Sequence, residues 1–131
     1  MPQIPWLAVL VATLAGFALG AVWYGPLFGK AWTRALGLSP DQMARISPTV
    51  AYGATFAWAL LTATVLGAEL GQGAGAKWGL TCSAAIGAFF VLPSLATNYL
   101  FEGKPFLVTA INGGYHVVRF ALMGLVIGLL A

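Results

Sequence analysis

Four long apolar runs, separated by short polar segments, dominate the chain. Each run is long enough to cross the hydrocarbon core of a bilayer as a helix, which takes about 20 apolar residues. The runs lack the apolar–polar alternation of transmembrane strands, and a helix satisfies its backbone hydrogen bonds within one segment. The pattern predicts an all-α integral membrane four-helix bundle, residues 1–131 forming a single membrane domain, with spans at residues 6–24, 48–70, 77–101 and 105–130.

The segment after the first run has an amphipathic pattern. Phe28, Trp32 and Leu36 are spaced four residues apart, and Lys30 and Arg34 fall on another face of the same helix. This spacing predicts a short helix that lies along the membrane interface.

The connecting segments contain start and turn signals. Ser39, Pro40 and Gln42 combine an N-cap, a proline at the first helical position and a capping-box glutamine. The sequence EGKP at residues 102–105 is typical of a tight turn. The third and fourth runs are therefore expected to form an antiparallel helical hairpin.

Composition supports a membrane environment. Of the 131 residues, 60% are hydrophobic and 7% are charged, and the mean hydropathy is +0.91. Soluble domains carry about 25% charged residues, so this chain could not cover a water-facing surface. The six Lys and Arg residues are scattered and form no basic face, which argues against nucleic acid as a partner.

The positive charges also predict an orientation. Lys30, Arg34, Arg45 and Lys104 fall in the first and third loops, whereas Lys77 is on the opposite side. Because cytoplasmic loops carry an excess of Lys and Arg, we expect those two loops in the cytoplasm and both termini outside it. The predicted location is the inner (plasma) membrane of a bacterium, as a multi-pass protein.

Two blocks of the chain resemble a known family. IPWLAVLVATLAGFALGAVWYGPLFGKAW at residues 4–32 and TNYLFEGKPFLVTAINGGYHVVRFALMG at residues 97–124 are similar to the opening and closing motifs of the bacterial membrane-protein family called domain of unknown function 1761. The resemblance extends over essentially the whole chain and implies four transmembrane helices. It implies no activity, so a function has to come from the residues.

The fourth run contains an unusual set of polar residues. Asn112, His116 and Arg119 fall on one stripe of the predicted helix, with Tyr115 beside it. Arg119 is expected near the middle of the bilayer, where a lipid-facing arginine costs from roughly 3 to over 10 kcal/mol. Its side chain must therefore face protein, water or a ligand.

The third run offers partners for this stripe. Pro93 cannot donate a hydrogen bond to the carbonyl of Phe89, so we expect a kink there and a hydrogen bond from Arg119 to that free carbonyl. Asn98 is expected at the depth of Asn112. These pairings predict a polar seam between the third and fourth helices, whose candidate ligand-binding residues are Ser94, Asn98, Asn112, Tyr115, His116 and Arg119.

Two functional hypotheses follow from this seam. In the first, it binds or transports a small anion or a lipid headgroup, with His116 able to change its charge near neutral pH. In the second, the protein is a structural or accessory subunit, and the seam only stabilises helix packing. An enzyme is not expected, because the one histidine, the single Cys82 and the few carboxylates have no spacing for a metal site or an acid–base pair. No catalytic residue, metal or cofactor is predicted.

Glycine pairs suggest close helix contacts. Gly16 and Gly20 in the first run, and Gly124 and Gly128 in the fourth, each have the spacing that lets helix backbones approach. A small bundle also exposes much of its surface, so a homo-oligomer in the lipid bilayer is a further hypothesis.

Overall fold

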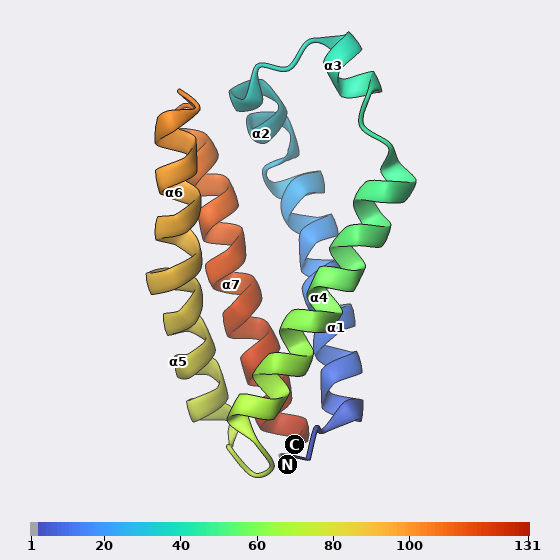
Figure 1. Ribbon diagram of the computed structural model, residues 1–131, viewed down its shortest axis with the longest axis vertical. Coiled ribbons are helices and arrows are strands. Elements are labelled where there is room, and N and C mark those ends of the chain that lie inside the picture. The colour runs from blue at the N-terminus through green and yellow to red at the C-terminus, as the bar shows by residue number, and fades with distance from the viewer. Residues whose placement is uncertain (1–2) are drawn as a thin grey trace.

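The computed structural model describes residues 3–131, and within that range it contains helices and connecting loops but no strand (Figure 1). The all-α prediction is thus confirmed. The elements are α1 (Trp6–Val22), the π-helical turn η1 (Trp23–Leu27), α2 (Gly29–Leu36), α3 (Pro40–Ala44), α4 (Pro48–Leu70), α5 (Ala76–Ile86), the π-helical turn η2 (Gly87–Val91), α6 (Leu92–Phe101) and α7 (Phe106–Leu130).

Four helical segments are long and apolar enough to cross a membrane, as predicted, so the lipid bilayer is the protein's environment. They are Trp6–Leu27, Pro48–Leu70, Ala76–Phe101 and Phe106–Leu130. The first continues to Leu27, past the expected end at Tyr24, because η1 extends the helix of α1 without a break.

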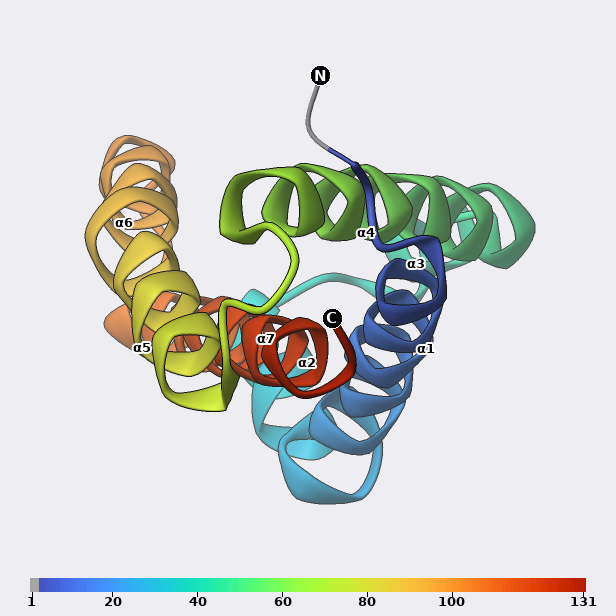
Figure 2. The same ribbon diagram turned by 90° about the horizontal axis from the view of Figure 1, so that it is seen from below.

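Helix α7 lies at the centre of the molecule. Figure 2 shows α5 on one side of α7 and α1 on the other, with α4 packed across α1. Met123 and Ile127 of α7 are fully buried and pack against Val9 of α1 and Leu66 of α4. The two chain ends lie at the same end of the bundle, and α2 and α3 lie at the other (Figure 1).

Glycines bring α5 and α7 into backbone contact. A methyl group on Gly79 would overlap the carbonyl oxygen of Gly124, and one on Gly128 would overlap that of Gly75. Gly16 of α1 also packs closely against α7, here against a side chain: a methyl group on Gly16 would come within 3.2 Å of the Met123 sulfur. The glycine pairs seen in the sequence are therefore used inside one chain, and they give no support to a homo-oligomer.

The two π-helical turns lie next to prolines. Pro26 is inside η1, where the Phe28 N–H donates to the Trp23 carbonyl at 2.8 Å. Turn η2 ends just before Pro93, and the Leu92 N–H reaches back to the Gly87 carbonyl. A π-turn inserts one residue into the helix and so changes which carbonyl lies opposite the proline. The helix irregularity expected at Pro93 is thus the π-helical turn η2.

The first connection has the predicted helices. Helix α2 ends at Gly37, whose left-handed backbone (φ 64°) suits glycine. Helix α3 begins with a complete capping box, in which the Gln42 N–H donates to Ser39 Oγ and the Ser39 N–H donates to Gln42 Oε1. The short amphipathic helix after the first span is confirmed as α2.

Helix α4 separates from the bundle along its first half. Every residue from 48 to 58 is exposed, and the first buried position is Ala59. In this half, Phe17 of α1 reaches α4 by edge-on ring contacts with Tyr52 and Phe56, at centroid distances of 6.2 and 5.8 Å. The site described next lies beside this separation.

Candidate functional site

Arg119 faces helices α1 and α4. A methyl group placed on Gly16 of α1 would come within 3.4 Å of Arg119 Cγ, so the side-chain stem lies against that helix. Beyond the stem is a cavity of about 180 Å³, here called the Arg119 pocket. It is lined by Phe17 of α1, Thr55, Trp58 and Ala59 of α4, and Tyr115, His116 and Arg119 of α7.

The contacts of the guanidinium are few and weak. Its Nη2–H group donates to His116 Nδ1 at 3.3 Å, and its Nη1–H group points at the Met123 sulfur at 3.7 Å. The Phe120 ring centroid lies 5.0 Å from Arg119 Cζ, close enough for a cation–π contact. All three of these partners belong to α7 itself.

One donor of Arg119 is left without a partner. Its Nε is buried, and within residues 3–131 it finds no hydrogen-bond acceptor. An unpaired buried donor costs about 1–3 kcal/mol, and more when the group is charged. The side chain therefore has hydrogen-bonding capacity that the described part of the protein does not use.

The positive charge of Arg119 is also not paired with a carboxylate from residues 3–131. Asp41, Glu69 and Glu102 are exposed, and no ion pair to Arg119 occurs among residues 3–131. Arg119 lies near the middle of the 25-residue helix α7, in the depth range where charges are most costly. Residues 3–131 thus supply no negative charge beside the Arg119 guanidinium.

His116 adds a second donor to the pocket. Arginine stays protonated, so in the contact between the two side chains Arg119 donates and His116 Nδ1 accepts. The ring hydrogen of a neutral His116 is then on Nε2, where it can donate to another group. Arg119, His116 and the Thr55 hydroxyl thus supply donors from two helices that line one cavity.

Asn112 belongs to a separate network nearer the α2 end. The Tyr24 hydroxyl donates to Asn112 Oδ1 at 2.6 Å, and Asn112 Nδ2 donates to the Tyr99 hydroxyl at 2.9 Å. The Trp23 indole N–H donates to the Ile111 carbonyl at 3.0 Å. This network ties η1 and α6 to α7.

Tyr115 joins the network to the pocket. Its ring lies 5.1 Å from the ring of Tyr24 and 5.1 Å from that of His116. Its hydroxyl donates to the Gly16 carbonyl at 3.2 Å. The aromatic residues thus form a continuous wall along α7 from the Asn112 network to the Arg119 pocket.

The structure does not bring together the full set of candidate residues. Tyr115, His116 and Arg119 meet in the pocket, whereas Asn112 lies in its own network. Ser94 and Asn98 are exposed on α6, and the Ser94 hydroxyl donates to the Phe90 carbonyl of its own helix. The expected pairing of Asn98 with Asn112 is wrong, because both tyrosine hydroxyls already occupy the Asn112 amide.

The expected bond from Arg119 to the Phe89 carbonyl is not formed either. The face of α7 toward the third span is filled by close packing: a methyl on Gly87 would come within 2.9 Å of Val117 Cα, and one on Gly113 within 2.9 Å of Leu92 Cγ. This packing turns Arg119 toward α1 and α4. His116 and Arg119 therefore line a pocket with α1 and α4, and the polar contact described above between the third and fourth spans is the hydrogen bond from Asn112 to Tyr99.

A signal for this arrangement was present in the sequence. Gly79, Ser83 and Gly87 are spaced four residues apart along the third run, which gives it one continuous small face, and all three are buried. Small residues in series mark where another helix packs most closely. Because this small face packs closely against one side of α7, the His116 and Arg119 side chains of α7 had to lie on another side.

Within the described chain, residues 3–131, no group of three or more His, Cys, Asp or Glu side chains could hold a metal ion. A protein-family model matches residues 7–128, and its description is "Protein of unknown function (DUF1761)". No curated protein and no solved structure shows significant similarity to the chain.

Proposed function

We propose that this protein, which belongs to the DUF1761 family, binds an anionic group in the Arg119 pocket. The proposal rests on two observations: the Arg119 side chain lines a cavity of about 180 Å³, and its guanidinium has no acceptor for Nε among residues 3–131. A phosphate or carboxylate oxygen placed there would form a charge-assisted hydrogen bond, which is stronger than the present contacts to sulfur and imidazole.

The pocket lining supports an anion over other ligands. Arg119 contributes a fixed positive charge, and His116 and Thr55 contribute neutral donors, while no carboxylate lines the cavity. Because Thr55 is on α4 and Arg119 on α7, a bound anion would link the two helices where α4 is otherwise separated. Phe17 and Trp58 add apolar side chains to the lining, and electrostatic attraction is stronger in an apolar surrounding than in bulk water.

Two sources could supply this anion. The exposed first half of α4 leaves the pocket open toward the lipid, so a phospholipid whose headgroup sinks below the interface could bring its phosphate to Arg119, and the cavity volume also suits a free small anion. We propose binding rather than catalysis, because no cysteine, serine or carboxylate side chain lines the pocket. Transport of the bound anion would be a further step, measurable as anion flux into liposomes.

The test is the thermal stability of the purified protein in detergent. Wild-type protein is titrated with chloride, sulfate or inorganic phosphate in one arm, and with phosphatidylglycerol in the other. A rise in the midpoint of about 5 °C or more at saturation is expected in at least one arm. Arg119→Leu should abolish the rise with free anions and remove the part of the phosphatidylglycerol rise that depends on Arg119. Arg119→Lys should retain part of both, since it keeps the charge.

A matched control separates the pocket from general charge effects. Arg45→Leu removes one positive charge at an exposed position outside the pocket, and it should leave the rise intact. If no anion and no anionic lipid shifts the wild-type midpoint, anion binding at Arg119 is refuted. The arm in which Arg119→Leu reduces the rise identifies whether the anion bound at Arg119 is free or lipid-borne, and a rise that Arg119→Leu leaves unchanged in every arm also refutes the proposal.

A structural role is the second candidate. The Arg119 stem packs against Gly16, and the Tyr115 hydroxyl is bonded to the Gly16 carbonyl, so these side chains also fix α1 against α7. If packing is their only role, Arg119→Leu should lower the midpoint in the absence of any anion, and anions should shift wild type and variant equally.

The positions of the Lys and Arg residues also support an orientation of the protein in the membrane. Lys30, Arg34, Arg45 and Lys104 belong to the connections at the end with α2 and α3, opposite the chain termini. We propose that the protein lies in the inner membrane of a bacterium and that this end faces the cytoplasm. The thiol-labelling experiment in the Discussion tests it.

A further inference from the structure

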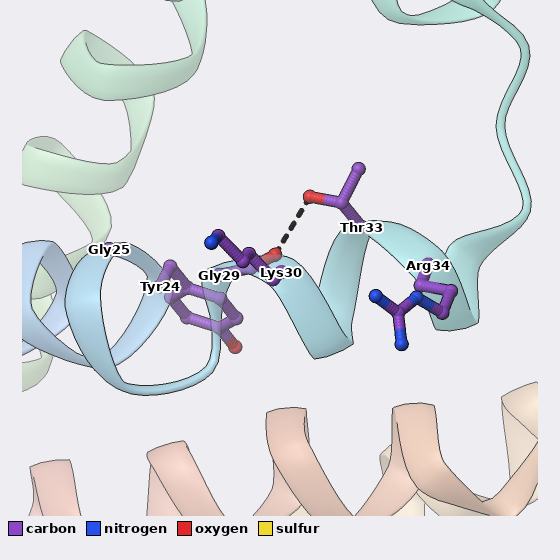
Figure 3. A pocket seen from close by; sticks show the side chains of 6 residues that line it. All are labelled: Tyr24, Gly25, Gly29, Lys30, Thr33 and Arg34. Atoms are coloured by element: carbon purple, nitrogen blue, oxygen red, sulfur yellow. Dashed lines mark hydrogen bonds between the residues drawn. The ribbon is translucent and has the colours of Figure 1, made fainter.

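A shallow, widely open hollow lies on the surface at the end of the first span. Its volume is about 530 Å³, and it is formed by η1 and α2. Its lining residues, shown in Figure 3, are Tyr24, Gly25, Gly29, Lys30, Thr33 and Arg34. It is here called the α2 groove, and it contains none of the residues that line the Arg119 pocket.

The α2 groove is positively charged. Lys30 and Arg34 are one helical turn apart on α2, both are exposed, and neither forms an ion pair in the part of the chain that the structure describes. No carboxylate is among the lining residues. The Thr33 hydroxyl donates to the Gly29 carbonyl at 2.8 Å, as the dashed line in Figure 3 marks, so its hydrogen is already used. The groove's free donors are therefore the two cationic groups.

Glycine keeps the α2 groove open. A methyl group on Gly25 would meet nothing within 4 Å, so this residue borders empty space. Gly29 is different, because a methyl group there would come within 3.2 Å of the Tyr24 carbonyl carbon. A large side chain at position 25 would thus extend into open space beside the groove without displacing the backbone.

The depth of the α2 groove points to the kind of ligand. It begins where the first span ends, at Leu27, and continues along the amphipathic helix α2. Trp23 and Trp32 lie on either side of that boundary, as aromatic residues do at the level of lipid headgroups. The molecules that surround a protein at this level are phospholipid headgroups.

We propose that the α2 groove binds the headgroup of an anionic phospholipid, with Lys30 and Arg34 holding its phosphate. Two cations without an acidic neighbour match a headgroup of net negative charge, such as phosphatidylglycerol. The choline group of a zwitterionic headgroup would instead be repelled by them. This site goes beyond the function proposed for Arg119 and does not depend on it.

The experiment compares lipids and variants in the full-length protein. Purified protein in a neutral detergent is titrated with phosphatidylglycerol, phosphatidylcholine or soluble glycerol phosphate, and the thermal midpoint is measured. Bound lipid is counted by native mass spectrometry. For wild type, phosphatidylglycerol should raise the midpoint by about 5 °C and remain bound, and phosphatidylcholine should do neither.

Three variants identify the groove as the site. The double variant Lys30→Gln with Arg34→Gln should lose at least about half of the midpoint rise and one bound lipid. Gly25→Leu, which keeps all charges but adds a large side chain beside the groove, should do the same. The control Arg45→Gln with Lys77→Gln removes as much charge from exposed positions outside the groove and should behave as wild type.

The proposal is overturned if the control loses as much lipid as the groove variants, or if the groove variants keep full binding. It is also overturned if glycerol phosphate produces the whole rise, since the ligand would then be a free phosphate. Failure of anion binding at Arg119 would leave this result unchanged, because Arg119 is outside the groove.

Discussion

At the scale of single residues, Arg119 and Asn112 show two ways of placing a polar group in a membrane helix. Both amide atoms of Asn112 that form hydrogen bonds have tyrosine hydroxyls as partners. Arg119 has only a sulfur and an imidazole, and its Nε has no partner within residues 3–131. Asn112 therefore acts as a structural link, whereas Arg119 has a donor that the described residues leave unused.

Replacing Asn112 should destabilise the protein. Asn112→Ala leaves the hydroxyls of Tyr24 and Tyr99 without their partner, and we expect a loss of about 1–2 kcal/mol in the free energy of unfolding. Unfolding in mixed SDS micelles measures it. The matched control is Asn98→Ala on the exposed face of α6, which should change stability by less than about 0.5 kcal/mol. An equal loss in both variants would contradict the Asn112 network.

Sequence reasoning succeeded at this scale only in part. It identified Arg119 and His116 as residues that must face away from lipid, because the cost of exposing a charge depends only on depth. It failed for Ser94 and Asn98, because matching depths along two helices says nothing about which faces meet. Thr55 and Phe17 were missed, since neither residue type is unusual in an apolar span.

At the scale of helices, local signals predicted starts and ends, and packing decided the rest. Ser39 and Gln42 form the capping box that their spacing indicates, and Gly37 ends α2. The polar stripe of α7 did not by itself show which neighbouring helices it would face. It follows from Gly79, Ser83 and Gly87 on the neighbouring span, which bring that span against the other side of α7.

The close contact between α5 and α7 should be sensitive to one added methyl group. In Gly124→Ala the new carbon would overlap the carbonyl oxygen of Gly79 and the side chain of Ser83, so the helices must move apart. Overpacking of this kind costs about 1–3 kcal/mol. Thermal unfolding of the purified protein should show a clearly lowered midpoint.

Gly53 provides the control on α4. A methyl group there meets nothing within 4 Å, and alanine favours a helix by up to about 1 kcal/mol over glycine. Gly53→Ala should therefore be neutral or slightly stabilising. Equal destabilisation by both substitutions would show that the α5–α7 contact is not as tight as described.

At the scale of the whole molecule, the four spans place both chain ends on one side of the membrane (Figure 1). The loop from Gly71 to Gly75 lies at that same end, and α2 and α3 lie at the other. The number of spans was predictable because hydropathy depends only on local composition. The arrangement around α7 was not, since it depends on contacts between distant segments.

The orientation of the molecule can be tested with introduced cysteines. In a Cys82→Ala background, Gln72→Cys lies in the loop near the chain ends, and Ala44→Cys lies in α3 at the opposite end; both positions are exposed. A membrane-impermeant maleimide should label the cysteine at position 72 in intact cells. The cysteine at position 44 should be labelled only after the membrane is permeabilised. The reverse pattern would invert the proposed orientation.

The separation of α4 along residues 48–58 gives the protein a different cross-section in each leaflet. In the leaflet that contains α2, lipid must fill the space around this half of α4, whereas in the other leaflet the four spans are packed together. The described helices thus form a wedge, and we expect such a shape to respond to the lateral pressure of a surrounding bilayer. Cone-shaped lipids added to the α2 leaflet should press α4 toward α1, and inverted cones should draw it away, so curvature stress would change the width of the cavity between α4 and α7.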